Sequence, residues 1–379
     1  MKILLLIFLL LPCAIFAQEE SAKVDSLLRI VAIEENDSSK IMLYFQVVEE
    51  LMYNDPRRGL FYTQEAKKIA AREESFTELY YFGMLYTAIL HTYLNEYELA
   101  AQRYDSLLNL AAALKDSTSL AQAYMTIGGI EAGLRHHEVA MEYYMKSIEV
   151  AESINDSEIV WTGMYNMAGM QLETEQWEDA ISRFRDSYRQ VDAIKNISSE
   201  EKSTRKADAL VVVAYCFNQM GDYDSALVNL YPAIYVLDSL ESYYTLTDAL
   251  YNVAEAHNEL GNYDSALYYY RYSMKAEKTY NKEAITFSSD YNGMGYVFLK
   301  MSQLDSAEYY LQRAYEGLEQ TNHTDKRAKN YSYLAQLYEK KGNYKKAYQF
   351  AQLHKIAADS IVDEERTEQI DRLQTQFNV

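Results

Sequence analysis

The sequence predicts an all-α protein, a right-handed α-α superhelical solenoid of about eight helix-turn-helix repeats with roughly 40 residues each. Three observations lead to this fold class. Gly occurs 13 times and Pro 3 times in 379 residues, which favours long helices joined by short turns. The motif Gly-Asp-Tyr-Asp-Ser-Ala at residues 221–226 returns almost unchanged at 261–266 and, altered, at five further places. A small residue stands twelve positions before the alanine that ends each copy of the motif.

Residues 1–17 predict a signal peptide, because Lys2 precedes an unbroken apolar run that ends in Ala-Ile-Phe-Ala before the polar Gln18. We expect cleavage after Ala17 and export to a periplasm of the Gram-negative type. A retained membrane anchor is the alternative, although the apolar run is shorter than the roughly 20 residues that a spanning helix needs. No later stretch is apolar enough to span a bilayer, so we expect no membrane span after cleavage. Residues 18–40 are expected to form an N-terminal capping helix.

Residues 41–355 are expected to hold the repeats, and the alanine that ends each motif serves as the anchor of its repeat. Successive alanine anchors are 40, 40, 46, 40, 41 and 40 residues apart. Each unit is expected to be a helix, a tight turn and a second helix, because Gly or Asn accepts a left-handed turn and the following Asp or Asn can cap a helix. The longest interval contains the polar loop 196–202, a predicted joint between two halves. The anchors are Gly59, in an atypical capping repeat, and Ala100, Ala140, Ala180, Ala226, Ala266, Ala307 and Ala347.

This pattern resembles the tetratricopeptide repeat family in its longer form of roughly 40 residues. The small residues carry the resemblance, together with aromatic residues three positions before and four positions after most anchors. The sequence departs from the family pattern at Leu304, which replaces Tyr, and at Ala351, which replaces the second aromatic residue. The resemblance implies that the first helices of successive repeats line a concave face. The small residues, which let two helices approach closely, are Ala88, Gly128, Ala168, Ala214, Ala254, Gly295 and Ala335.

Residues 356–379 are expected to form a C-terminal amphipathic helix or the start of a coiled coil, since Ile370, Leu373 and Phe377 stand at helical spacing. Together with the signal peptide and the repeats, this plan resembles the exported sensor regions of bacterial membrane regulators of the histidine kinase or DNA-binding type. The resemblance implies, as an alternative to a stand-alone scaffold, the periplasmic sensor part of a transmembrane signalling regulator or a shortened paralogue of one.

If the first helices line a concave face, the positions fifteen, eleven and eight residues before each anchor point into it as an i, i+4, i+7 set. These positions hold mostly apolar residues or glycine in the first half of the array, whereas Tyr, Asn and Glu dominate in the second half. Tyr supplies rigid amphipathic contact area, and Asn amides can pair with the backbone of an extended peptide. The alternative, that many of these side chains are simply solvated or make contacts within their repeats, stays open. The candidate groove residues are Tyr165, Tyr215, Asn218, Tyr251, Glu255, Asn258, Asn292 and Tyr296.

The formal net charge of −20 repels phosphate backbones, so we expect no nucleic-acid binding by the solenoid itself. The same charge favours a neutral or basic protein or peptide as the partner. A homodimer is a further option that the sequence leaves open. Cys216 is the only cysteine after Ala17, which excludes an intramolecular disulfide in the exported protein.

The sequence contains no motif that indicates catalysis. It has no phosphate-cradling glycine loop, no Gly-x-Ser-x-Gly elbow and no kinase motif, and His136-His137 has no Cys, His or acidic partner at ligand spacing. We therefore expect no enzyme, no cofactor and no metal. A hydrolase with paired carboxylates is the second alternative, because such sites are defined in space. The leading expectation is an exported scaffold or adaptor that binds a protein or peptide partner in its concave groove.

Overall fold

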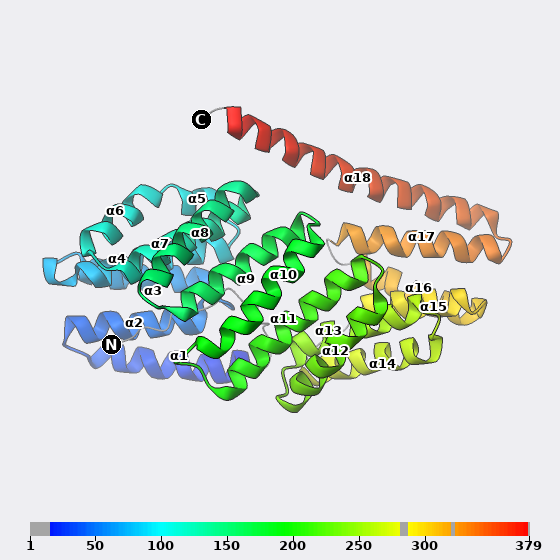
Figure 1. Cartoon of the computed structure of the whole chain (residues 1–379), viewed down its shortest axis with the longest axis horizontal. Coiled ribbons are helices and arrows are strands. Elements are labelled where there is room, and N and C mark those ends of the chain that lie inside the picture. Colours follow the sequence, from blue (N-terminus) through cyan, green and yellow to red (C-terminus); the bar gives the residue numbers. More distant parts are fainter. Residues whose placement is uncertain (1–15, 281–286, 320–322, 378–379) are drawn as a thin grey trace. The chain divides into compact units, whose positions relative to one another are not determined.

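The computed structural model describes the backbone of residues 16–280, 287–319 and 323–377. These residues form α-helices and two short 3-10 helices, and no strand occurs among them, which confirms the predicted all-α fold class (Figure 1). Most of the predicted signal peptide, residues 1–15, lies outside the described residues. Within the described ranges, no helix is both long and apolar enough to cross a membrane.

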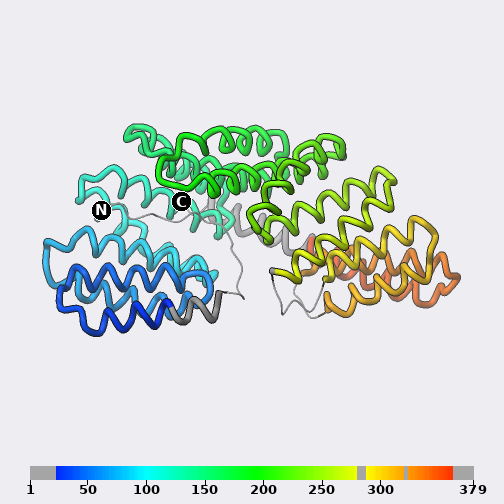
Figure 2. The backbone as a smooth tube through the Cα atoms, turned by 90° about the horizontal axis from the view of Figure 1, so that it is seen from below, coloured from blue at the N-terminus to red at the C-terminus, as the bar shows by residue number. Residues whose placement is uncertain are grey.

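The chain divides into two compact units, Met1–Lys202 and Ser203–Val379, which we describe separately. The boundary falls inside α11, because this helix begins at Ser199, within the stretch 196–202 that the sequence predicted to be a loop. Within each unit, consecutive helices form hairpins, as the tube in Figure 2 shows. The helices of the first unit are α1 (Phe16–Ile33), α2 (Asp37–Leu51), α3 (Pro56–Ala70), η1 (Glu74–Phe76), α4 (Thr77–Tyr93), α5 (Tyr97–Ala101), α6 (Tyr104–Leu114), α7 (Ser117–Gly133), α8 (His137–Ser153), α9 (Ser157–Glu173), α10 (Trp177–Gln190) and η2 (Val191–Ala193).

The second unit begins inside α11 and ends with the longest helix of the chain. Most of its buried core comes from two clusters of mostly aliphatic side chains, one that contains Leu230 and Leu250 and one that contains Leu311 and Leu334. The helices are α11 (Ser199–Gln219), α12 (Tyr223–Ser239), α13 (Tyr243–Glu259), α14 (Tyr263–Tyr280), α15 (Ser288–Lys300), α16 (Leu304–Leu318), α17 (Thr324–Lys340) and α18 (Tyr344–Phe377).

Most anchor residues and small residues are buried where the helices of a repeat meet, whereas Ala335 and Ala347 of the last repeat are partly buried. A Cβ atom on Gly128 would lie 2.7 Å from the ring of Tyr144, and one on Gly295 would lie 2.6 Å from Cγ of Leu311. Tyr144 and Leu311 each stand four positions after an anchor, so the small residue exists because a large side chain of the second helix fills its space. The anchor alanines that are at most 1% exposed are Ala100, Ala140, Ala180, Ala226, Ala266 and Ala307.

The turn inside each repeat uses a left-handed backbone conformation whether or not a glycine is present. Gly221 and Gly261 have φ of 77°, and Arg135 and Glu175, at the equivalent position, have φ of 60° and 57°. After the turn, Asp222 accepts a hydrogen bond from the backbone N–H of Ser225 at 3.1 Å and so caps α12. The repeat therefore imposes the turn even where its residue pays a steric cost that glycine avoids.

Two elements at the ends of the chain differ from the sequence-based expectation. Residues 18–40 do not form one capping helix, because Asn36 caps a new helix, α2, by accepting a hydrogen bond from the Ser39 backbone N–H at 2.8 Å. The C-terminal segment is helical as expected, but its described residues, 356–377, do not begin a separate helix. They continue α18, which runs unbroken from Tyr344 to Phe377 because no Gly or Pro interrupts it.

Candidate functional site

The candidate groove residues lie on the first helix of each hairpin. In the second unit these first helices are α11, α13, α15 and α17, and their shared surface is here called the first-helix surface. Seven of the eight candidates lie on α11, α13 and α15, and Tyr165 lies on α9 of the first unit. Tyr165 stacks on Trp161 with 5.2 Å between ring centroids and meets the ring of Phe184 edge-on at 5.1 Å. It thus contributes to the packing of the first unit.

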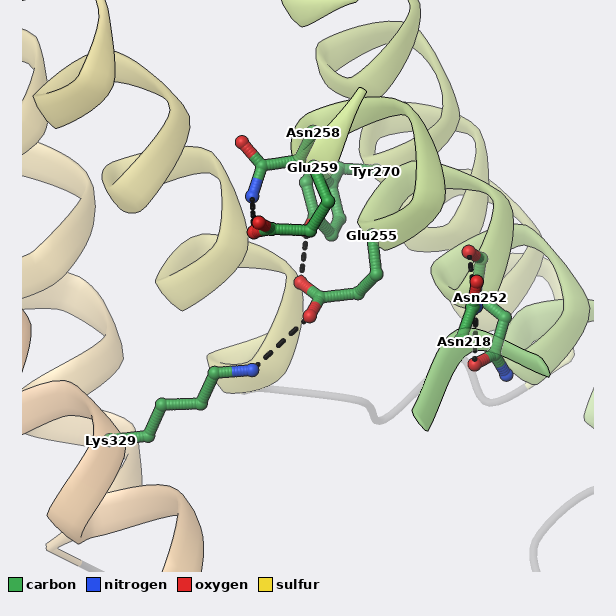
Figure 3. A network of polar contacts seen from close by, with 7 residues as sticks. All are labelled: Asn218, Asn252, Glu255, Asn258, Glu259, Tyr270 and Lys329. Atoms are coloured by element: carbon green, nitrogen blue, oxygen red, sulfur yellow. Dashed lines mark hydrogen bonds and ion pairs between the residues drawn. The ribbon is translucent and has the colours of Figure 1, made fainter. Parts of the chain in front are cut away.

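Glu255 is the centre of a polar network on the first-helix surface (Figure 3). Its carboxylate accepts a hydrogen bond from the Tyr270 hydroxyl of α14 and forms an ion pair with Lys329 of α17, with 3.2 Å between Nζ and Oε2. The side chains of Lys329 and Glu255 are 47% and 25% exposed. One carboxylate therefore holds side chains from two other helices while it remains accessible to solvent.

Two tyrosines beside this carboxylate are held in their neutral form. The ring of Tyr251 meets that of Tyr270 edge-on, with 5.6 Å between centroids. Desolvation, followed by the charge of Glu255, raises the pKa of both phenols well above the usual range. Both phenols therefore stay neutral beside the Glu255 carboxylate and can donate hydrogen bonds.

An aromatic stack lies between α15 and α17. The rings of Tyr296 and Tyr333 are stacked, with 4.1 Å between centroids and 11° between planes. Lys300 places its ammonium over the Tyr296 ring, 4.9 Å from its centroid. Both tyrosines are half-buried, so the edge of the stack is accessible to a partner. Because the rings are already fixed by stacking, binding a partner would cost little side-chain entropy.

On α11, the two candidates have different surroundings. Tyr215 is 37% exposed. Asn218 is partly buried, and its Nδ2 donates to the backbone oxygen of Asn252 on α13 at 3.0 Å. The amide of Asn218 therefore ties α11 to the next first helix.

The other two asparagines face the interior more than the sequence pattern suggests. Asn258 is 4% exposed, and its Nδ2 donates to Oε1 of Glu259 at 3.2 Å. Asn292 is 5% exposed, and its Oδ1 accepts a hydrogen bond from Asn330 at 3.0 Å. In this structure both amides make contacts within and between repeats, as the open alternative in the sequence analysis describes.

A row of acidic residues on the same helices was missed by the sequence analysis. Asp208 on α11 and Asp248 on α13 stand eighteen residues before their anchors, and Asp290 on α15 stands seventeen before its anchor. Extending the groove pattern by one helical turn, from fifteen to eighteen residues before the anchor, would have found Asp208, Asp248 and also Lys329. These acids were passed over because charges on helices usually face solvent.

Burial sets the protonation of this row. Asp208 is 7% exposed, and desolvation raises its pKa to about 6 although Thr245 and Arg205 act in the opposite direction. Asp290 is 4% exposed, and desolvation raises its pKa to about 8, since its hydrogen bond with Ser273 does not compensate. Buried carboxyl groups with a strongly raised pKa occur more often at functional sites than elsewhere in proteins.

Taken together, the first-helix surface offers an aromatic stack, several carboxylates and a few lysines. On α13, Glu255 pairs with Lys329, Glu259 lies near Lys300, and Asp248 lies near Lys326. Such a surface can stack on an apolar side chain and attract a cationic one.

No protein-family model matches the chain, and no curated protein matches its sequence. Several solved structures have a similar fold. The apo form of RapI is 14% identical, with a TM-score of 0.66 over 91% of this chain and 97% of that chain. The apo form of the quorum sensor NprR from B. thuringiensis is 14% identical, with a TM-score of 0.64 over 90% of this chain and 99% of that chain. A Rap protein in complex with Competence and Sporulation Factor is 14% identical, with a TM-score of 0.51 over 92% and 99%. The fold is of the tetratricopeptide repeat type, as the sequence predicted.

Proposed function

We propose that this chain is an exported scaffold or adaptor whose first-helix surface binds a protein or peptide segment. The observation that carries the proposal is the half-buried stack of Tyr296 and Tyr333 beside the partly exposed ion pair of Glu255 and Lys329. Partly exposed tyrosine bordered by charged groups is typical of the energetically important part of a protein interface. We propose binding without catalysis, because these side chains stack, pair and donate hydrogen bonds in a way that suits recognition.

The similar structures support a binding role. One was solved as a Rap protein in complex with Competence and Sporulation Factor, and another is a quorum sensor. At 14% identity they share the fold with this chain, and the chemistry of the surface must come from its own residues. The net charge of −20 favours a neutral or basic partner.

The alternative is the sensor part of a transmembrane signalling regulator, and α18 favours it. This helix continues as a single element of 34 residues from Tyr344 to Phe377. A helix of this length suits the start of a coiled coil that passes a binding event onward.

Binding can be tested with a displayed library of random heptapeptides selected on the immobilised protein. The expected result is a family of enriched sequences whose synthetic peptides bind in solution, with affinity reduced at least about tenfold by Tyr296→Ala. Tyr235→Ala is the matched control, because Tyr235 is 79% exposed on the second helix α12 and should leave affinity unchanged. Failure to enrich any sequence, or equal binding by wild type and Tyr296→Ala, would reject the proposal.

A further inference from the structure

Asp290 holds a buried carboxylate oxygen that lacks a donor. The side chain is 4% exposed, and its Oδ1 has no hydrogen-bond partner. Its hydrogen bond with the Ser273 hydroxyl occupies the group only in part. Buried polar atoms in folded proteins are nearly always paired, so this oxygen indicates a missing donor.

The charges around Asp290 add to the deficit. Glu277 on α14 interacts electrostatically with Asp290 and also with Asp248 on α13, and both carboxyl groups have a raised pKa through desolvation. The cation that faces all three acids is Lys326 of α17, which is exposed and forms no ion pair with any residue in the described part of the chain. The phenols of Tyr251 and Tyr270, which also lie near Asp290, are neutral donors and bring no positive charge.

The repeat that begins with α11 places a cation beside the equivalent acid, although Oδ1 of Asp208 also lacks a hydrogen-bond partner. Asp208 and Asp248 occupy the same position, eighteen residues before Ala226 and Ala266. On α11, Arg205 precedes Asp208 by about one helical turn, and its charge lowers the pKa of Asp208. On α13 the position of Arg205 is taken by Thr245, so the repeat that contains Asp248 has no guanidinium of its own there.

We propose that Asp248, Glu277 and Asp290 form a subsite that binds one nitrogen cation of the partner, the guanidinium or ammonium of a basic side chain or the amino terminus of a peptide. The inference rests on the proposed function and specifies the chemistry of the bound segment. A cation in this place donates a hydrogen bond to Oδ1 of Asp290 and stabilises the ionised form of these desolvated carboxyl groups. An organic cation fits better than a metal ion, because the described residues contain no group of three or more His, Cys, Asp or Glu placed to hold a metal.

The test uses the heptapeptide library described above, selected on the whole protein. We expect Lys or Arg at one fixed position of the enriched peptides, and an at least tenfold loss of affinity when that residue is replaced by citrulline or norleucine. Asp290→Asn should cause a similar loss for the basic peptide and almost none for its neutral counterpart. Asp264→Asn is the matched control, since it removes one exposed carboxylate from the same unit. Acetylation of the peptide amino terminus distinguishes the two sources of the cation, because it weakens binding only if the terminus occupies the subsite.

The outcomes separate this inference from the proposed function. Enriched peptides that depend on Tyr296 but carry neither a preferred basic position nor a required amino terminus would overturn the subsite and leave the binding function intact. Absence of any enriched peptide would overturn both. If Asp290→Asn does not fold, as judged by circular dichroism, Glu277→Gln at the partly exposed side of the cluster replaces it, with the same expected selective loss.

Discussion

Lys329 of α17 and Glu255 of α13 form an ion pair of 3.2 Å although 74 residues separate them along the chain. Helix α15 packs against both α13 and α17, so this pair joins two repeats that are not consecutive. Glu255 also accepts the hydrogen bond from Tyr270, whereas Lys329 has one acidic partner among the described residues. The two members of the pair should therefore differ in their importance for stability.

Replacing Lys329 by Met should lower the free energy of unfolding by no more than about 1 kcal/mol, because the lysine is 47% exposed and exposed ion pairs contribute little. Replacing Glu255 by Ala should cost about 1–3 kcal/mol, since it leaves the hydroxyl of the fully buried Tyr270 without its acceptor. Urea denaturation of the two variants measures both values. Equal losses would show that Tyr270 does not depend on Glu255.

Gly293→Ala should destabilise the same network from the opposite side. A Cβ atom at this position would lie 2.3 Å from the Tyr270 ring, and that ring is buried and tied to Glu255, so we expect a loss of about 1–3 kcal/mol. Gly169→Ala is the control, because a Cβ there has no neighbour within 4 Å and alanine favours the helix by about 0.5–1 kcal/mol. Thermal unfolding should thus give opposite shifts for two chemically identical substitutions, and a rise for Gly293→Ala would contradict the packing.

The repeats could be predicted from the sequence because small and large residues recur at fixed distances from each anchor. A hairpin closes only if a small residue on its first helix faces the bulky residue that stands four positions after the anchor on its second helix. Gly128 and Tyr144 form such a pair. The turns at Arg135 and Glu175 could be placed for the same reason, although neither residue favours a positive φ. Residue spacing alone therefore determined the hairpins.

The candidate site was less predictable because burial at its edge depends on neighbouring side chains. Asn258 and Asn292 follow the expected helical spacing, yet both are buried, since a small rotation of a first helix decides whether such a residue faces solvent. Asp290 occupies a position that is alanine in α13, and no rule of spacing predicts an acid at a packing position. The pairing of Glu255 with Lys329 depends on contacts two repeats apart, which sequence periodicity does not encode.

Stability should fall as the pH rises through the neutral range. The pKa of Asp290 is raised from 3.8 to about 8 in the folded state, so between these values the folded chain holds a proton that the unfolded chain releases. The free energy of unfolding then decreases by at most about 1.4 kcal/mol per pH unit. Asp208, with its pKa raised to about 6, contributes only to the lower part of this range. Urea denaturation between pH 6 and pH 8 should show a smaller slope for Asp290→Asn than for wild type, whereas Asp208→Asn should differ from wild type only near pH 6. Parallel curves for wild type and Asp290→Asn would contradict the assignment.

Binding of a cationic peptide should be linked to the release of a proton from Asp290. At pH 7 most of this carboxyl group is protonated, because its pKa is about 8, whereas the bound cation favours the ionised form. The affinity should therefore rise up to about tenfold per pH unit until about pH 8 and then level off. Calorimetric titrations in phosphate and in Tris at pH 7 measure the proton directly, because the two buffers take it up with different enthalpies. Wild type should give different heats in the two buffers and Asp290→Asn the same heat in both. Identical heats for the wild-type protein would mean that the cation does not reach Asp290.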